Sequence, residues 1–486
     1  MGKAKNIFKV RGATRPSPSC PPKDLPTRYS AQLGNSIADA GDVNGDGYTD
    51  MIVGAPGASN GQVGEGLAYV HYGSANGLPA PPNLQLEANV AGAQFGFSVS
   101  TAGDVNGDGY SDVLVGAPSS GANGRVYLFM GSAGGLGTVP AVTLSQGSQF
   151  GYSVATAGDV NTDGYSDIII GSPGSNEAFV FRGTSSGLAT GYYFGLTEPQ
   201  AGAFYGCSVS TAGDVNGDGY SDVIVGARNY SNGQSNEGVA FIYHGGVSSV
   251  NEPYSTRLEV NQAAAGFGVS VSGASDVNGD GYMDVVVGAD LWEQGQTDEG
   301  AAFLFYGTAA GVNPIGYATL QRNQTGGHMG HSVAEGGDVN GDGYADVIVG
   351  APLNANGQSA EGLVYVYHGS SAGIVSIGYE QLEQNSANYQ MGIAVAGGGD
   401  VDGDGYSDVL AGAPVANPSF SNEGAGYWFR GCVAKAYNRL TRQYDADLVT
   451  PMSTNSVDFS NFLFFGIGHR ARSPIQRCKA RLRWEV

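Results

Sequence analysis

The sequence predicts an all-β protein: a seven-bladed β-propeller of four-stranded antiparallel blades, followed by a small C-terminal β element. Three observations predict it. An acidic stretch such as Asp-Val-Asn-Gly-Asp-Gly-Tyr-Ser-Asp at 214–222 recurs seven times, and the first aspartates of successive copies lie 62, 55, 55, 62, 62 and 62 residues apart. Short β-branched and aromatic runs, bounded by Gly, Pro, Asn and Ser clusters, surround each copy as strands would. No stretch within the repeats sustains helical spacing.

Each repeat contains four such runs, which the second copy illustrates. They are an alternating run at 95–103, a β-branched run at 111–118, an aromatic-rich run at 125–132 and a weaker run at 141–146. Four antiparallel strands per unit, repeated at a fixed period, are typical of a propeller, and closing the ring protects the sheet edges. The first run alternates small residues with a branched apolar one. We therefore expect it to be the innermost strand, where seven copies crowd together.

The repeats resemble FG-GAP repeats, which form the seven-bladed propeller at the head of integrin α subunits and of related bacterial surface proteins. The Phe-Gly pair occurs at 95–96, 150–151 and 267–268, and Gly-Ala-Pro occurs at 54–56, 116–118, 350–352 and 412–414. Leu33, Tyr205, Met329 and Met391 replace the Phe, and the Gly-Ala-Pro positions at 171–173, 226–228 and 288–290 depart mildly. The resemblance covers about 29–431, which we expect to be the propeller.

The two ends of the chain differ from this middle in charge. Residues 1–28 form a basic, Pro-containing arm with seven Lys/Arg and one acidic residue, and residues 432–486 carry nine Lys/Arg and four acidic residues. The ring needs a closing strand, for which 7–10 and 437–443 are both candidates; the resemblance favours an N-terminal strand, but the choice stays open. Residues 432–486 are expected to form the C-terminal β element. Cys207 takes an apolar strand position, and the pairing of Cys20, Cys432 and Cys478 is left open.

The acidic loop has the pattern of a calcium site. Side-chain oxygens fall at its positions 1, 3, 5 and 9, a tyrosine at position 7 offers a backbone carbonyl, and glycine at position 6 permits the positive φ that turns the chain around an ion. Hard oxygen ligands suit Ca²⁺ better than Mg²⁺ or Zn²⁺. Asp-Gly and Asn-Gly also form plain turns, but a turn does not require carboxylates at fixed offsets in seven copies. An EF-hand is excluded because position 12 is Val, Ile or Ala within a strand.

Seven Ca²⁺ sites are therefore expected, with ligands at positions 1, 3, 5, 7 and 9 of each loop. These residues are Asp42, Asn44, Asp46, Tyr48 and Asp50; Asp104, Asn106, Asp108, Tyr110 and Asp112; Asp159, Asn161, Asp163, Tyr165 and Asp167; Asp214, Asn216, Asp218, Tyr220 and Asp222; Asp276, Asn278, Asp280, Tyr282 and Asp284; Asp338, Asn340, Asp342, Tyr344 and Asp346; and Asp400, Asp402, Asp404, Tyr406 and Asp408. The additional carboxylate of Asp402 predicts that the seventh site binds most tightly, if ligand charge dominates.

Charge and composition exclude several functions. The whole chain carries a formal charge of −22, concentrated in the repeats, so we expect no nucleic-acid partner. No apolar run is long enough for a membrane span, and no secretory signal is visible. Gly-x-Ser-x-Gly occurs at 183–187 and 369–373, but the equivalent turns of other repeats lack the serine, so we expect no enzyme. The resemblance implies a secreted or cell-surface adhesion protein.

A ligand is expected on the face opposite the calcium loops. Five repeats have longer connections between their second and third strands, which end in Glu-Gly, and in integrins that face meets the ligand. The candidate contacts are Tyr230, Asp290, Trp292, Glu293 and Phe420, for a protein or a glycan, although these aromatic residues could equally pack the loops together. No aromatic residue recurs regularly there, which favours a protein partner. A lectin-like module and a structural component of a surface assembly are the alternatives.

Overall fold

The computed structural model describes residues 7–10, 31–191, 193–376, 378–416 and 422–431. The chain divides into two compact units, residues 1–432 and 433–486. The second unit, and with it the expected C-terminal β element, lies outside the described residues. Every regular element in the described ranges is a strand. These ranges contain no helix that is long and apolar enough to cross a membrane.

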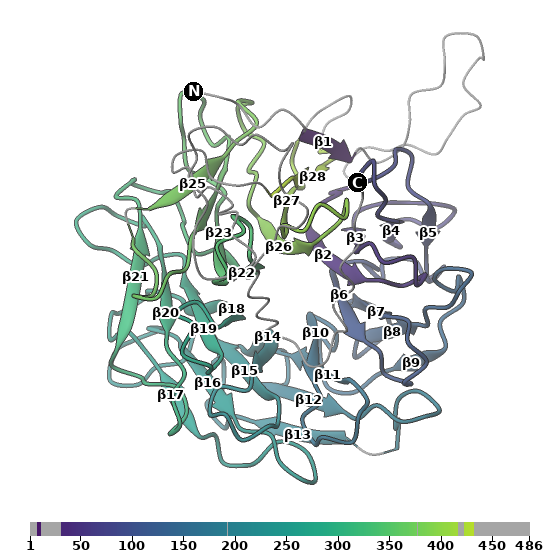
Figure 1. The fold of residues 1–486 in the computed structure, drawn as a ribbon, viewed down its shortest axis with the longest axis horizontal. Coiled ribbons are helices and arrows are strands. Elements are labelled where there is room, and N and C mark those ends of the chain that lie inside the picture. Colours follow the sequence, from purple (N-terminus) through teal and green to yellow (C-terminus); the bar gives the residue numbers. More distant parts are fainter. Residues whose placement is uncertain (1–6, 11–30, 192, 377, 417–421, 432–486) are drawn as a thin grey trace, which may run out of the picture. The chain divides into compact units, whose positions relative to one another are not determined.

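Seven four-stranded antiparallel sheets form a ring, which confirms the predicted fold (Figure 1). Blade 1 contains β2 (Ser36–Gly41), β3 (Asp50–Ala55), β4 (Leu67–His71) and β5 (Leu84–Leu86); blade 2 contains β6 (Ser98–Gly103), β7 (Asp112–Ala117), β8 (Arg125–Phe129) and β9 (Val142–Leu144); blade 3 contains β10 (Ser153–Gly158), β11 (Asp167–Ser172), β12 (Glu177–Phe181) and β13 (Tyr193–Thr197); and blade 4 contains β14 (Tyr205–Gly213), β15 (Asp222–Ala227), β16 (Val239–Tyr243) and β17 (Thr256–Leu258).

Blade 5 contains β18 (Phe267–Ser275), β19 (Asp284–Ala289), β20 (Ala301–Phe305) and β21 (Tyr317–Gln321); blade 6 contains β22 (Ser332–Gly337), β23 (Asp346–Ala351), β24 (Leu363–Tyr367) and β25 (Tyr379–Leu382); and blade 7 contains β26 (Ala394–Gly399), β27 (Asp408–Ala413) and β28 (Ala425–Phe429), to which β1 (Ile7–Val10) is added. In blade 7, β1 pairs antiparallel with β28, and Ile7 lies opposite Phe429. Of the two strands that the sequence offered for ring closure, the N-terminal one therefore pairs with the last blade, while 437–443 lie outside the described residues.

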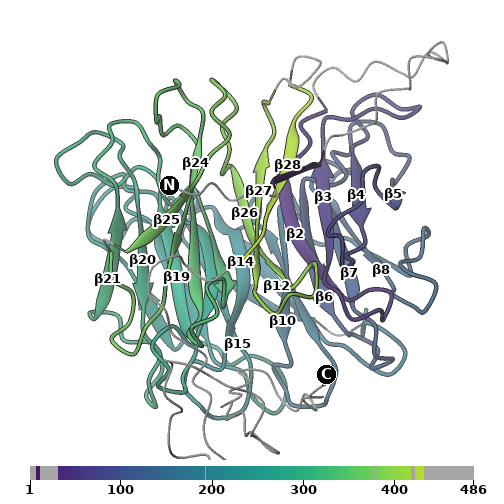
Figure 2. The same ribbon diagram turned by 45° about the horizontal axis from the view of Figure 1, so that its top comes forward.

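The first strand of each blade lies nearest the axis, as its small residues predicted. Strands β2, β6, β10, β14, β18, β22 and β26 each contact the corresponding strand of the two neighbouring blades, and Figure 1 shows them around the centre of the ring. Figure 2 shows the same strands obliquely, with the connecting loops gathered at the two ends of the sheets. This arrangement divides the loops between two faces.

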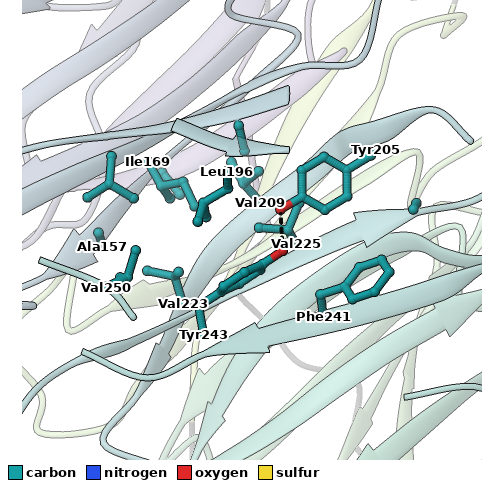
Figure 3. Close-up of a cluster of buried hydrophobic side chains, with 14 of the residues drawn as sticks. Ala157, Ile169, Leu196, Tyr205, Val209, Val223, Val225, Phe241, Tyr243 and Val250 are labelled. Carbon is teal, nitrogen blue, oxygen red and sulfur yellow. Dashed lines mark hydrogen bonds between the residues drawn. The ribbon is translucent and has the colours of Figure 1, made fainter. Parts of the chain in front are cut away.

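The hydrophobic core lies between adjacent blades. One cluster joins Ile169 and Leu196 of blade 3 to Tyr205 and Tyr243 of blade 4, and Figure 3 shows these side chains facing one another. The hydroxyl of Tyr205 donates a hydrogen bond to that of Tyr243 (2.8 Å), so the polar atoms of both buried rings are paired. Because each blade contributes to two such layers, a blade completes its core only when both neighbours are present.

A close glycine contact joins each blade to the next. A Cβ atom added to Gly288 in β19 would lie 1.9 Å from the carbonyl oxygen of Gly330, which belongs to blade 6. The same contact, at 1.9 to 2.2 Å, recurs at all seven junctions. The strand glycines are Gly54, Gly116, Gly171, Gly226, Gly288, Gly350 and Gly412, which face the carbonyls of Gly96, Gly151, Gly206, Gly268, Gly330, Gly392 and Gly34. A side chain at the strand position would separate the blades.

The Glu-Gly pair at the end of each long connection joins neighbouring blades as well. The backbone carbonyl of Glu65 accepts a hydrogen bond from the N–H of Phe95 in blade 2 (2.8 Å), and Gly66 forms a parallel bridge with Phe95. The carboxylate of Glu65 is fully buried, and its Oε1 accepts the N–H of Asn60 from the same connection. The recurrent Glu therefore has a structural role: its carboxylate orders its own loop, and its backbone carbonyl is hydrogen-bonded to the next blade.

Replacing Gly288 by Ala is expected to lower the free energy of unfolding by about 3 kcal/mol, because the added methyl group overlaps the Gly330 carbonyl. Urea denaturation of the full chain measures this. Gly191→Ala is the control, since a Cβ there meets no atom within 4 Å; it should change stability by less than about 0.5 kcal/mol. Equal losses in the two variants would contradict the junction's importance.

Candidate metal centres

The acidic loops all lie on one face of the ring, because each connects the first strand of a blade to the second. The second strand starts at the position-9 aspartate, as β15 does at Asp222. It ends at the connection to the third strand, so the acidic loops and the long connections lie at opposite ends of the same strand. The structure thus places the predicted metal residues on one face and Tyr230, Asp290, Trp292 and Glu293, the predicted ligand contacts that it describes, toward the other.

The acidic loop of blade 4 shows how these residues are arranged. Asp214 at position 1 accepts backbone hydrogen bonds at both oxygens: Oδ1 from Gly217 (2.7 Å) and Asp218 (3.0 Å), and Oδ2 from Gly219 (2.8 Å). Gly219 at position 6 has a φ of +92°, and its equivalents lie between +89° and +95°, as the sequence predicted. The loop therefore curls around the first carboxylate.

The aspartate at position 9 is fully buried in every blade and braces the loop. In blade 4, Asp222 Oδ2 accepts the N–H of Val215 (3.0 Å) and Oδ1 accepts the N–H of Gly245 beyond the third strand (2.8 Å). Burial raises the pKa of Asp222 to about 7, although these two hydrogen bonds oppose the shift; the carboxylates of Asp218 and Asp214 raise it further. A cation beside these oxygens would favour the ionised form.

The other position-9 aspartates follow the same pattern. Burial raises the pKa to about 7 for Asp50, Asp167, Asp284 and Asp408, and to about 6 for Asp112. In blade 6, burial also raises the pKa of Asp346, but His368 opposes the rise, because its Nδ1 lies 3.0 Å from Asp346 Oδ2.

Positions 3 and 5 meet in each loop. In six loops the side-chain amide of the position-3 Asn donates to the position-5 Asp at 2.9 to 3.2 Å. In the seventh, one carboxylate oxygen from each of Asp400, Asp402 and Asp404 lies within 4.8 Å of the others, and Asp402 Oδ1 is buried without a hydrogen-bond partner. Carboxylate and amide oxygens are the ligands that Ca²⁺ takes in proteins, so the residues present fit such an ion.

Hydrogen bonds link the seven acidic loops into a ring. The N–H of the residue at position 8 donates to the carbonyl of the position-1 aspartate in the preceding blade, as Ser111 does to Asp42 (3.0 Å). All seven junctions have this bond, at 3.0 to 3.4 Å, including Thr49 to Asp400 where blade 1 meets blade 7. The sequence did not predict these bonds, because the donors and acceptors belong to different repeats.

The predicted ligand contacts on the opposite face are spread over several environments. Tyr230 packs against Phe241 with ring centroids 5.6 Å apart, and Trp292 packs against Phe303 at 5.5 Å. Glu293 is exposed. Phe420 lies outside the described residues.

Asp290 is buried and paired rather than free at the surface. Its Oδ2 lies 3.0 Å from Nδ1 of His331, and its Oδ1 lies 3.9 Å from Arg228. Burial would raise the pKa of Asp290, but His331 and Arg228 outweigh that effect and lower it. The partner of His331 could not be inferred from the sequence, since 41 residues separate it from Asp290.

A cavity of about 330 Å³ lies on the ring axis, where the innermost strands begin. Its lining includes Phe97, Tyr152, Cys207, Val269 and His331, each from a different blade. Cys207 is a free, buried cysteine, and burial raises the pKa of its thiol to about 11. It therefore behaves as the apolar residue that its strand position predicted.

Asp222→Ala is expected to lower the free energy of unfolding by about 2–4 kcal/mol in excess chelator, because it leaves the buried N–H groups of Val215 and Gly245 without an acceptor. Asp218→Ala changes an exposed position of the same loop and should cost less than about 1 kcal/mol under the same conditions. Urea denaturation compares the two. A smaller loss for Asp222→Ala than for Asp218→Ala would contradict the bracing role.

Comparison with known proteins shows the same repeats. The FG-GAP repeat model matches residues 34–71, 95–129, 208–243, 267–305, 329–367 and 391–427, and a model of an FG-GAP-like repeat matches 159–225. Together these matches cover more than half of the chain. The FG-GAP repeat model matches blades 1, 2, 4, 5, 6 and 7, and the FG-GAP-like model matches parts of blades 3 and 4. Every blade is therefore matched.

Integrin α chains are among the relatives. Integrin alpha-4 of Xenopus laevis is 32% identical over 252 residues, which are 50% of this chain and 24% of the relative. Integrin alpha-IIb of Homo sapiens is 35% identical over 168 residues, or 32% and 16% of the two chains, and integrin alpha pat-2 of Caenorhabditis elegans is 34% identical over 227 residues, or 41% and 18%. The matches span a quarter or less of these relatives' own length.

The WD40 domain of coronin from Toxoplasma gondii aligns over 88% of this chain and 86% of its own, with a TM-score of 0.46 and 8% identity, which is too low a similarity to carry an argument. The repeat matches, the integrin α relatives and the seven blades agree with one another. The chain therefore belongs to the family of FG-GAP repeat proteins, and its propeller is of the integrin-α-like kind.

Proposed function

We propose that this protein is a calcium-binding, non-catalytic propeller that serves adhesion or ligand binding, secreted or displayed on a cell surface. The observation that carries the proposal is the ring of seven acidic loops, each with the same oxygen-bearing positions and each hydrogen-bonded to the next. The similarity to integrin α chains supports an adhesion-type propeller and an extracellular location. The matches span a quarter or less of the integrin chains, so the remaining activities of an integrin are not implied.

Calcium would reduce the repulsion among the carboxylates that are concentrated on this face. Each loop brings at least three carboxylates together, and burial already raises the pKa of the position-9 carboxyl. Seven Ca²⁺ ions would change the formal charge of the chain from −22 to −8. Each ion would be held by positions 1, 3, 5 and 9 and by the backbone carbonyl of position 7, and would tie the end of the innermost strand to the start of the second.

The ligand is proposed to bind the opposite face, at the long connections of blades 4 and 5. Tyr230 and Trp292 are held by ring contacts with their own blades, so their orientation is fixed before a ligand arrives. Glu293 is exposed beside Trp292, and the N–H of Glu293 is held by Gln262 (2.7 Å). Tyr230, Trp292 and Glu293 form the proposed contact surface, while Asp290, also expected there, is buried and paired with His331, and Phe420 lies outside the described residues.

The two Gly-x-Ser-x-Gly segments support a non-catalytic assignment. In both, the second residue forms a turn: Thr184 donates from its hydroxyl to the carbonyl of Gly187 (2.5 Å) and Ser370 to that of Gly373 (2.6 Å). Ser74, in a repeat without the central serine, makes the same bond to Gly77 (2.7 Å). The motif is thus a shared strand connection in which the central serine has no special part.

Removing calcium is expected to lower the melting temperature, because each native-only site contributes roughly 2.7 kcal/mol when the free ion is a hundredfold above its dissociation constant. Differential scanning calorimetry of the full chain, in excess Ca²⁺ and in excess chelator, measures the shift. Magnesium at the same concentration is the control. Melting curves that coincide in calcium and chelator would argue strongly against calcium binding.

Loss of the ligand contacts should weaken binding without unfolding the ring. A double variant, Trp292→Ala with Glu293→Ala, is expected to lower the affinity for an extracellular protein ligand at least tenfold. Truncating an aromatic residue at the centre of an interface costs about 2 kcal/mol or more when that residue is a hot spot. Surface plasmon resonance against a protein library and a glycan array, each with and without Ca²⁺, separates the two ligand classes. Unchanged binding by the double variant would refute this location.

A further inference from the structure

One residue of each blade lies beside the acidic loop at the end of the third strand. The glycine that follows it donates its N–H to the position-9 aspartate, as Gly431 does to Asp408 (2.7 Å), which fixes the preceding residue against the loop. From blade 1 to blade 7 this preceding residue is Tyr72, Met130, Arg182, His244, Tyr306, His368 and Arg430. Blade 7 therefore places an arginine beside the loop with the extra carboxylate.

Arg430 pairs directly with two of the predicted metal ligands. Its Nε lies 2.5 Å from Oδ2 of Asp402 and 2.9 Å from Oδ2 of Asp404. The side chains of these aspartates are only 3% and 22% exposed, whereas that of Arg430 is 39% exposed. The guanidinium thus reaches inward from the surface and covers oxygens that are largely withdrawn from water.

The charge of Arg430 offsets the one substitution that distinguishes the seventh loop. Positions 1, 3, 5 and 9 carry four carboxylates in this loop and three in each of the others. Adding the guanidinium returns the local sum to that of the carboxylates in each of the other loops. Blade 6 has a further basic group, His368, which pairs with the position-9 carboxylate Asp346. The prediction that the seventh site binds calcium most tightly counted only its carboxylates, and it therefore omitted the positive charge of Arg430 that the fold places beside them.

We propose that Arg430 is a built-in competitor of the divalent ion in blade 7. With no ion bound, it offsets one of the loop's four negative charges and keeps Asp402 and Asp404 in place; before these oxygens can ligate an ion, the guanidinium must withdraw. The seventh site is then the weakest of the seven and the first to empty as calcium falls. This inference rests on the proposed calcium binding.

Arg430 lies in the blade at which the ring closes, where an additional positive charge could stabilise the junction. Blade 7 meets blade 1 where the ring closes, through the contact of Gly412 with Gly34 and the hydrogen bond from Thr49 to Asp400 (3.1 Å). The other six junctions join consecutive segments of chain, whereas this one joins segments far apart in sequence. A tethered cation at this loop would hold the seam when calcium is scarce.

Blade 3 offers a matched control. Arg182 occupies the same position before Gly183, but position 3 of its loop is Asn161, and among the described residues no ion pair joins Arg182 to the loop. Met130 occupies the position in blade 2, so methionine is compatible with the fold there. Arg430→Met and Arg182→Met therefore remove the same charge from equivalent positions.

The test is a calcium titration of the full chain after chelator treatment, followed by calorimetry. In the wild type, one site should be weaker than the others. Arg430→Met should tighten that weakest site about tenfold, the worth of one charge-assisted ion pair, and lower the melting temperature in chelator by about 1–2 °C. Arg182→Met should change neither quantity. If Arg430→Met folds poorly, as judged by circular dichroism, Arg430→Gln serves in its place.

The outcomes distinguish this inference from the proposed function. Calcium binding that stays the same or weakens in the Arg430 variants, while the wild type binds calcium, overturns only the competitor role. An equal gain in Arg182→Met also overturns it, because the effect would then reflect net charge alone. A wild type that binds no calcium overturns the proposed function and this inference together.

Discussion

The contact between glycines at each blade junction is the constraint on which the ring depends. The strand glycine of one blade, such as Gly288, has the carbonyl of the next blade's Gly330 where its side chain would be. Two sheets can approach this closely only when neither carries a Cβ at the contact. Because the contact recurs at all seven junctions, one substitution would disturb the angle between two blades and hence the closure of the whole ring.

The acidic loops reinforce the same junctions from the other end of the second strand. Near the glycine contact, the backbone of Glu65 and its equivalents holds the next blade; on the opposite face, the position-8 N–H bonds the position-1 carbonyl of the preceding blade. Each interface is thus fastened at both ends with the hydrophobic cluster between them. An ion in the acidic loop would stiffen the end where like charges otherwise repel.

The position-9 aspartate connects this electrostatic design to the fold. It is buried at the start of the second strand, and it accepts N–H groups from its own loop and from the turn after the third strand. A carboxylate in that place orders the loop whether or not an ion is bound, whereas the aspartates at position 1 are half-buried and those at position 5 are exposed in six of the seven loops. Arg430 extends this logic in blade 7, where a side chain supplies part of the neutralising charge.

The sequence by itself determined the number of blades, the four strands in each, the innermost strand and the residues of the acidic loops. These features are local: strand periodicity and the offsets of oxygen-bearing residues are set within some ten residues of chain. The family likeness follows from the same local patterns. Even the positive φ of Gly219 could be inferred from its place in the loop.

Only the tertiary structure decided which repeats touch and through which atoms. The pairing of Asp290 with His331, of Arg430 with Asp402 and of β1 with β28 depends on blade orientation and strand register. A pattern within one repeat carries no information about the distance to a side chain in another. The closing strand was ambiguous for that reason, since two segments had suitable residues and their position in space alone distinguishes them.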